Sequence, residues 1–182
     1  GHTAHVTAMT FAPDGRTLSS AGWDHAIRQW DLMPGKTLRV IKGVADPTGT
    51  ADPVGHRNVV TGLALSPGAR WLYSGSCDHT ICVWEAATGR LCRVLKGTNP
   101  GYSSVDALAL SPDGKRLAAA IGDEGQESTV HLWDVLTGEK AGTLPGHQGK
   151  VTRLASSPDG RRLASASTDT TILLWDAAPA RG

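Results

Sequence analysis

Residues 156–176 read SSPDGRRLASASTDTTILLWD, and close versions of this stretch occur three more times in the 182-residue chain. The other versions are FAPDGRTLSSAGWDHAIRQWD at 11–31, LSPGARWLYSGSCDHTICVWE at 65–85 and LSPDGKRLAAAIGDEGQESTVHLWD at 110–134. All four end in Trp followed by an acidic residue, and successive Trp residues are 54, 49 and 42 positions apart. Self-similarity at a period near 42, with insertions in the first two intervals, indicates a tandem array of repeats.

A second regularity lies inside the repeats. In the first repeat His2 stands 28 positions before Trp30, and Asp24 stands six positions before it. The second and fourth repeats show the same two spacings, whereas the third shows neither. This pattern predicts one recurring arrangement of side chains in three of the four repeats.

With these marks the chain resembles the WD-repeat β-propeller family over nearly all of its length. The resemblance implies an all-β fold in which each repeat forms one blade, a four-stranded antiparallel sheet. Gly-His is expected just before the innermost strand and Trp-Asp at the end of the third. Local signals agree, because alternating apolar positions such as Val60, Leu63 and Leu65 suit buried strands. Pro-Asp-Gly at 13–15, 112–114 and 158–160 is turn chemistry between the first and second strands.

Phasing the strands predicts where the blades begin and end. We expect blade one at 1–43, an inserted loop at 44–54, blade two at 55–97, blade three at 98–145 with a long turn at 122–128, and blade four at 146–182. Only AAPARG follows Asp176, so the fourth blade is expected to lack its outer strand, which makes about 15 strands.

Four blades predict an open partial propeller, or part of a larger ring. Propellers that resemble this chain usually close with about seven blades, so four leave the circle open, and a full ring would have about seven or eight. An open array leaves the apolar faces of its end blades uncovered, and this favours association. We expect the chain to be a segment of a longer propeller, or half of a two-chain ring formed by self-association.

Composition bounds the class of protein and its partners. Hydrophobic content of 40% is typical of soluble globular proteins. A net charge of +1 gives no general attraction to nucleic acid or to an anionic membrane, so neither is expected as a partner. Neither a signal peptide nor an apolar run of about 18 residues is visible, which favours a cytoplasmic location.

The resemblance assigns the recurring polar residues to structural tetrads, one in each regular blade. In each tetrad Asp is expected to accept a hydrogen bond from His, His to meet Ser, and Ser to meet the Trp indole N–H. Ser, His and Asp also form nucleophilic triads, but three equivalent copies favour a structural role, and no catalytic residue is predicted. The tetrads are His2, Ser20, Asp24 and Trp30; His56, Ser74, Asp78 and Trp84; and His147, Ser165, Asp169 and Trp175.

The third repeat departs from the pattern. GTNPGYSSV stands where Gly-His is expected, and Ala119 stands at the Ser position. Either packing alone stabilises this blade, or its altered loops serve recognition. Asp123, Glu124 and Glu127 in the long turn could meet a basic partner or a cation, and the alternative is a solvated turn.

Metal and cofactor sites are not predicted. Asp46 and Asp52 in the inserted loop provide too few oxygen donors for calcium, so that loop is interpreted as a surface excursion. Cys77, His79 and Cys82 lack a convincing fourth ligand for zinc. The odd number of cysteines argues against a disulfide framework.

The resemblance also implies where a partner docks, since partners in the family commonly bind the face around the central channel. Trp23 is the strongest candidate, because Trp is favoured at interface anchors, and packing over a neighbouring loop is the alternative. The positions that match the family's binding face are His5, Thr7 and Trp23; Val59, Thr61 and Cys77; Ser104, Asp106 and Gln126; and Lys150, Thr152 and Thr168.

Three functions follow from this reading. The first is a non-catalytic scaffold that binds a protein or peptide through the propeller face. The second is a sensor or regulatory segment of a larger signalling or effector protein, which a neighbouring kinase or nucleotide-binding motif would favour. The third is a metal-dependent propeller enzyme, for which convergent His and acidic residues outside the tetrads are missing from the sequence.

Overall fold

Fifteen strands make up the structure, a computed structural model that describes residues 1–43, 55–96, 103–123 and 128–177. The first half of the chain contains β1 (Val6–Phe11), β2 (Thr17–Gly22), β3 (Ala26–Asp31), β4 (Lys36–Lys42), β5 (Val60–Leu65), β6 (Trp71–Ser76), β7 (Thr80–Glu85) and β8 (Arg90–Lys96). The second half contains β9 (Ser103–Leu110), β10 (Arg116–Asp123), β11 (Thr129–Asp134), β12 (Lys140–Leu144), β13 (Val151–Ser156), β14 (Arg162–Ser167) and β15 (Ile172–Asp176).

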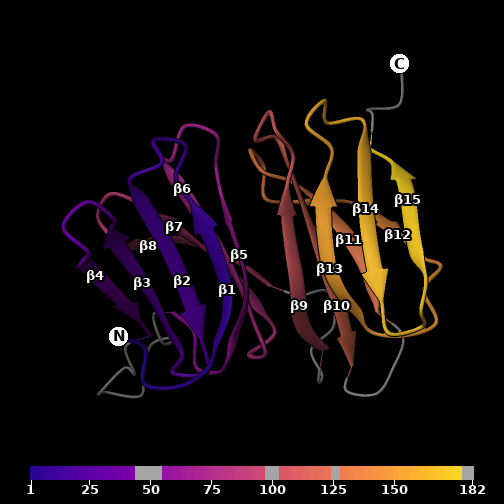
Figure 1. Cartoon of the computed structure of the whole chain (residues 1–182). Coiled ribbons are helices and arrows are strands. Elements are labelled where there is room, and N and C mark those ends of the chain that lie inside the picture. Colours follow the sequence, from indigo (N-terminus) through magenta and orange to yellow (C-terminus); the bar gives the residue numbers. More distant parts are fainter. Residues whose placement is uncertain (44–54, 97–102, 124–127, 178–182) are drawn as a thin grey trace.

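The strands form four antiparallel sheets in chain order (Figure 1). The first three sheets are β1–β4, β5–β8 and β9–β12, and the fourth consists of β13–β15 over the residues that the structure describes. The expected fold class is therefore confirmed, including the three-stranded last blade. The inserted loop at 44–54 and residues 124–127 of the long turn lie outside the described residues. In the described residues no helix is long and apolar enough to cross a membrane.

The hairpins owe their geometry to the turn residues. In the first, Gly15 has a φ of 65°, and Asp14 Oδ1 accepts the backbone N–H of Arg16 at 2.8 Å. Because glycine has no Cβ, it adopts this left-handed conformation without a steric clash. Pro-Asp-Gly therefore closes the turn without strain. The equivalent Gly114 and Gly160 have the same conformation.

Apolar side chains fill the spaces between neighbouring sheets. Ile27 and Ile41 of the first sheet pack with Leu72 and Trp84 of the second. Similar clusters join the second sheet to the third and the third to the fourth. Since the core consists of these three layers, each sheet is held mainly by its neighbours.

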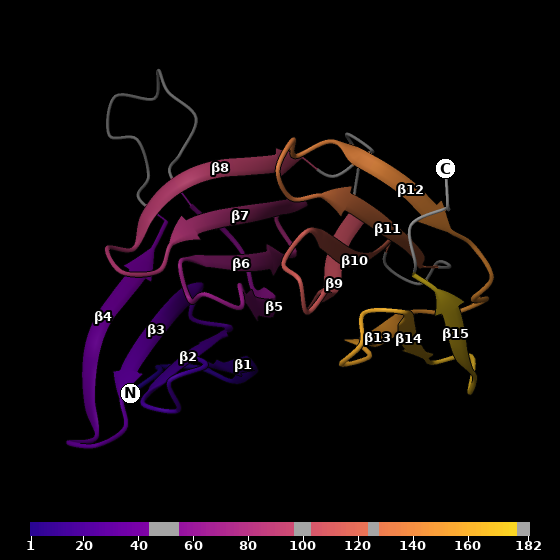
Figure 2. The same cartoon turned by 90° about the horizontal axis from the view of Figure 1, so that it is seen from above.

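The sheets are arranged as an arc, with the first strand of each sheet on the inside (Figure 2). β1 packs beside β5, β5 beside β9, and β9 beside β13. The first and fourth sheets lie on opposite sides of the arc, and the circle between them is open (Figure 2). The described residues thus form an arc of four propeller blades, as the four repeats predict.

Candidate functional site

The second sheet shows how the recurring polar residues are connected. His56 Nδ1 lies 2.9 Å from Asp78 Oδ2, and His56 Nε2 lies 2.7 Å from Ser74 Oγ. Trp84 Nε1 donates to the same Ser74 Oγ at 2.7 Å. The backbone N–H of Arg57 also donates to Asp78 Oδ2 at 2.9 Å. This hydrogen bond connects the segment before β5 to the turn between β6 and β7.

The first and fourth sheets repeat this geometry. His2 and His147 each lie 2.9 Å from their Asp and 2.7 Å from their Ser. The indole of Trp30 donates to Ser20 at 2.8 Å, and that of Trp175 donates to Ser165 at 3.0 Å. The same three hydrogen bonds therefore recur in the first, second and fourth sheets.

The His56 and Asp78 side chains of the second tetrad are both favoured in their charged forms. Burial by itself lowers the pKa of His56, but the hydrogen bond from its ring to Asp78 raises it to about 9. Burial by itself raises the pKa of Asp78, but the hydrogen bond from His56 lowers it to about 2. The two groups therefore stabilise each other's charged form.

The tetrad geometry leaves the serine unavailable for nucleophilic chemistry. Ser74 is 0% exposed, and its oxygen is already occupied by the Trp84 indole and the His56 ring. A nucleophile needs a substrate carbonyl next to its oxygen, and that space is filled. The arrangement can fix a loop to a sheet, and no room for a reaction remains around the oxygen.

The third sheet is packed differently. Trp133 is buried among apolar residues that include Leu117 and Ala119. His131 lies beside it, with ring centroids 5.8 Å apart, and its Nδ1 has no hydrogen-bond partner among the described residues. Burial, with a contribution from the charge of Lys140, lowers the pKa of His131 to about 4. His131 is outside the recurring pattern of the repeats, and its place in the strand before Trp133 is the signal of it in the sequence.

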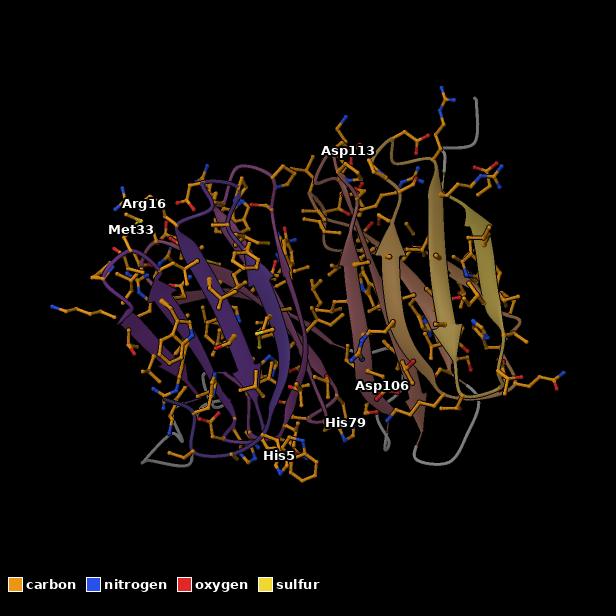
Figure 3. The ribbon with its side chains drawn as sticks, viewed as in Figure 1. His5, Arg16, Met33, His79, Asp106 and Asp113 are labelled. Atoms are coloured by element: carbon orange, nitrogen blue, oxygen red, sulfur yellow. The ribbon has the colours of Figure 1, made fainter. Side chains whose placement is uncertain are left out.

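The predicted docking residues that the structure describes lie at one end of the sheets, where β1, β5, β9 and β13 begin, and this end is called the docking end below. Figure 3 places His5, His79 and Asp106 at this end and Arg16, Met33 and Asp113 at the other. His5, Trp23, Lys150 and Thr168 are exposed, whereas Ser104 and Asp106 are buried. Gln126 lies outside the described residues.

Trp23 is the most prominent exposed side chain of this set. It is 58% exposed, and its ring centroid lies 6.1 Å from that of His5. Its backbone N–H donates to the carbonyl of His5 at 2.9 Å. The backbone is therefore anchored while much of the indole remains in solvent.

Three of the predicted docking threonines are engaged within the fold. Thr7 Oγ1 lies 3.1 Å from the carbonyl of Ala21 in its own sheet and also bonds the carbonyl of Val60 in the next sheet. Thr61 Oγ1 donates in the same way, to the carbonyl of Gly75 in its own sheet and to that of Val105 in the next sheet. Thr152 in the fourth sheet bonds Ala166 of its own sheet at 3.3 Å.

The third sheet has Asp106 at the position of these threonines. Its carboxylate accepts a hydrogen bond from Ser104 Oγ at 2.6 Å and lies 2.9 Å from Lys150 Nζ. This ion pair joins the third and fourth sheets at the docking end. The negative charge of the buried Asp106 is thereby balanced by Lys150 of the neighbouring sheet. The Lys150 side chain itself is about half exposed.

A groove of about 600 Å³ lies between the second and third sheets, away from the docking end. Aromatic and aliphatic side chains predominate in its wall, among them Trp71, Tyr73, Leu95, Leu117 and Trp133. None of the predicted docking residues within the described ranges lines it. Trp71 and Tyr73 were its signal in the sequence, since two large aromatic residues stand close together in the second repeat.

In the described residues no group of three or more His, Cys, Asp or Glu side chains could hold a metal ion.

The model of the WD domain, G-beta repeat, matches the chain at residues 1–31, 48–85, 89–134 and 138–176. The chain belongs to the WD-repeat family. Membership agrees with the four sheets and with the Trp followed by an acidic residue at the end of the third strand of each. WD-repeat propellers are generally non-catalytic.

Curated relatives resemble the chain at moderate identity. It is 33% identical over 155 residues to the ribosome biogenesis protein WDR12 homolog of Nematostella vectensis. It is 29% identical over 152 residues to pre-mRNA-processing factor 19 of Bos taurus, and 28% identical over 170 residues to the CCR4-associated factor 4 homolog of Candida glabrata. The matches cover 83%, 84% and 84% of this chain, respectively. The chain spans only 32%, 27% and 28% of those relatives, respectively.

Proposed function

We propose that this WD-repeat chain is a non-catalytic scaffold that binds a protein or peptide at the end of the sheets where His5, Trp23 and Lys150 lie. The observation that carries the proposal is the exposed indole of Trp23, held beside His5 by a backbone hydrogen bond. A large amphipathic ring on a rigid turn is the type of residue that dominates binding energy at protein interfaces.

The surroundings of Trp23 support a peptide rather than a small substrate. The docking end presents separate exposed groups on several sheets, including Lys150 and Thr168 on the fourth. Such spacing suits a partner that contacts several blades at once. The relatives' names, a pre-mRNA-processing factor and a ribosome biogenesis protein, concern different processes, and this favours a shared binding role over a shared reaction.

Peptide selection tests the proposal directly. The immobilised chain is panned against a random dodecapeptide library, and the affinity of selected peptides is measured by calorimetry. Because an interface Trp commonly contributes about 2 kcal/mol or more, Trp23→Ala is expected to weaken binding by at least about tenfold. Leu136→Ala is the matched control, since Leu136 is 86% exposed and lies in the wall of the groove, away from the docking end.

Two outcomes contradict the proposal. One is that no peptide is selected against the chain. The other is that selected peptides bind the Trp23→Ala variant as tightly as the wild type, particularly if Leu136→Ala weakens them. The second result would move the binding site to the groove between the second and third sheets.

A further inference from the structure

The groove between the second and third sheets lies beside a side chain that leaves space open. Trp71 pairs in register with Glu85, and Arg116 has the same position in the third sheet, where it pairs with Asp134. Arg116 crosses to the fourth sheet and donates to the carbonyl of Ala177, and the pocket that it lines there measures only about 20 Å³. Trp71 makes no such bond to the next sheet among the described residues, and the groove beside it measures about 600 Å³.

The next residue pair along the strands makes the groove apolar. Tyr73 pairs with Val83 in the second sheet, and both line the groove. At the corresponding place in the first sheet, Ser19 pairs with Gln29, and these two polar side chains are buried. The second sheet therefore faces its neighbour with aromatic and aliphatic side chains where the first sheet uses polar ones.

The size and the position of the groove suit a small molecule. Its volume falls within the range of about 300–1,000 Å³ that is typical of ligand pockets. Gly114 and Lys115 line it at the end of the sheets where Figure 3 places Asp113, opposite the docking end. Described residues form both walls, one supplied by the second sheet and the other by the third.

Positive charge predominates in the wall of the groove. Arg93 and Lys115 line it together with one acid, Asp134, which already accepts the backbone N–H of Thr137 at 2.8 Å. Lys115 lies near the exposed Asp113 and contributes to lowering the pKa of that carboxyl. Arg93 forms no salt bridge with a described acid, and its Nη1 makes a long hydrogen bond of 3.5 Å to a backbone carbonyl of the third sheet. The guanidinium of Arg93 therefore has donors left for an anion.

Tyr73 adds a hydroxyl group next to this guanidinium. The residue is 3% exposed and lines the groove, and its hydroxyl forms no hydrogen bond with the described part of the chain. Burial raises the pKa of the Tyr73 hydroxyl, and the positive charge of Arg93 acts in the opposite direction, so the two groups lie near each other. A guanidinium and a hydroxyl side by side can donate to the two oxygens of one carboxylate.

From these observations we propose that the groove binds a small molecule with a flat aromatic body and one carboxylate. The aromatic body packs among Trp71, Trp133 and Leu117, and the carboxylate accepts hydrogen bonds from Arg93 and Tyr73. The Arg70 guanidinium lies over the Trp71 ring, 4.8 Å from its centroid, which steadies this wall. The groove is separate from the docking end, so the inference does not rest on the function proposed above.

Titration calorimetry of the 182-residue chain tests the proposal with two matched probes. Naphthoate has the aromatic body and the carboxylate, whereas naphthalenemethanol keeps the body and has no charge. Naphthoate is expected to bind with a Kd at or below about 1 mM, a value typical of a ligand of this size. Naphthalenemethanol is expected to bind at least about tenfold more weakly, because a hydrogen bond to a charged group is stronger than one to a neutral group.

Variants identify the groups that hold the carboxylate. Arg93→Gln is expected to weaken naphthoate at least about tenfold and to leave naphthalenemethanol unchanged, which also shows that the groove is intact. Tyr73→Phe keeps the ring, removes the hydroxyl and is expected to cause a smaller loss of naphthoate affinity. Arg39→Gln is the matched control, since Arg39 has the register position of Arg93 in the first sheet and donates to Ala86 outside the groove. It is expected to bind naphthoate as the wild type does.

Cys92 locates the bound probe. It is an exposed thiol that lines the groove, and Cys77 does not line it. Saturating naphthoate is expected to slow the alkylation of Cys92 by iodoacetamide but not that of Cys77, as measured by peptide mass spectrometry. The proposal is overturned if naphthoate binds no more tightly than naphthalenemethanol, or if Cys92 stays unprotected. Equal losses for Arg93→Gln and Arg39→Gln also overturn it.

Discussion

At the scale of the residue, each tetrad histidine uses both ring nitrogens to join distant parts of one repeat. In the second repeat, His56 bonds Asp78 on the turn through one nitrogen and Ser74 within β6 through the other. The Trp84 indole, which would otherwise be a buried donor without a partner, is satisfied by the same serine. Every polar group in the tetrad depends on its neighbours, so one deletion leaves others unpaired.

Removal of the tetrad acid tests this dependence. Asp78→Ala leaves the His56 ring and the N–H of Arg57 without their acceptor, and is expected to lower the free energy of unfolding by about 1–3 kcal/mol. Urea unfolding followed by Trp fluorescence measures the change. Asp113→Ala, which removes an exposed turn carboxylate, is the control and is expected to cost less. Equal losses for the two variants would argue against the tetrad's structural role.

The same pair predicts how stability depends on pH. The pKa of His56 is about 9 in the folded chain, above its ordinary value of 6.5. The folded state therefore binds more protons than the unfolded state between these values, and stability falls as the pH rises from 6.5 to 9. Asp78, with its pKa lowered to about 2, loses its contribution as the pH falls below 3.8.

Unfolding free energies measured across this range check the sign of the effect. The wild type is expected to lose stability between pH 6.5 and pH 9, and Asp78→Ala is expected to show a smaller slope. A wild-type stability that rises over this interval would contradict the coupling between His56 and Asp78.

At the scale of the element, the sheets are connected by contacts that recur from one junction to the next. Isoleucine or valine side chains such as Ile27, Ile81 and Val130 are buried at the three junctions. Thr7 and Thr61 add a hydrogen bond across the first two junctions, and at the third an ion pair between Asp106 and Lys150 takes its place. The third sheet lacks a tetrad and relies on this packing.

Thr61→Val tests the contact between sheets. Valine keeps the shape and strand preference of threonine but removes the hydroxyl that bonds Gly75 and Val105. The variant is expected to lose about 0.5–1.5 kcal/mol of unfolding free energy. Thr152→Val is the matched control, because among the described residues the Thr152 hydroxyl bonds Ala166 of its own sheet and no residue of another sheet, and the loss should be smaller.

At the scale of the whole molecule, the docking end and the groove between the second and third sheets are separate surfaces. Binding at one can therefore be disturbed without altering the other. Trp23 belongs to the first and Leu136 to the second, and both side chains are more than half exposed.

The sequence by itself determined the repeats, the strands and the partners within each tetrad. His56, Ser74, Asp78 and Trp84 lie within one repeat, and the hairpin register that brings them together follows from the turns and the alternation of apolar residues. The spacing of 28 residues between His and Trp marked the repeats, and the resemblance to the WD-repeat family assigned these four residues to one tetrad. Ala119 likewise showed in advance that the third blade has no tetrad serine.

Only the tertiary structure decided what lies between repeats. The Asp106–Lys150 ion pair, the groove beside Trp71 and the exposure of Ile172 depend on how one sheet stacks on the next. Ile81 and Ile172 have the same place in the repeat pattern, yet one is buried and the other is in solvent. A repeat specifies its own hairpins through local hydrogen bonds, but the burial of its faces depends on whether a neighbour is present.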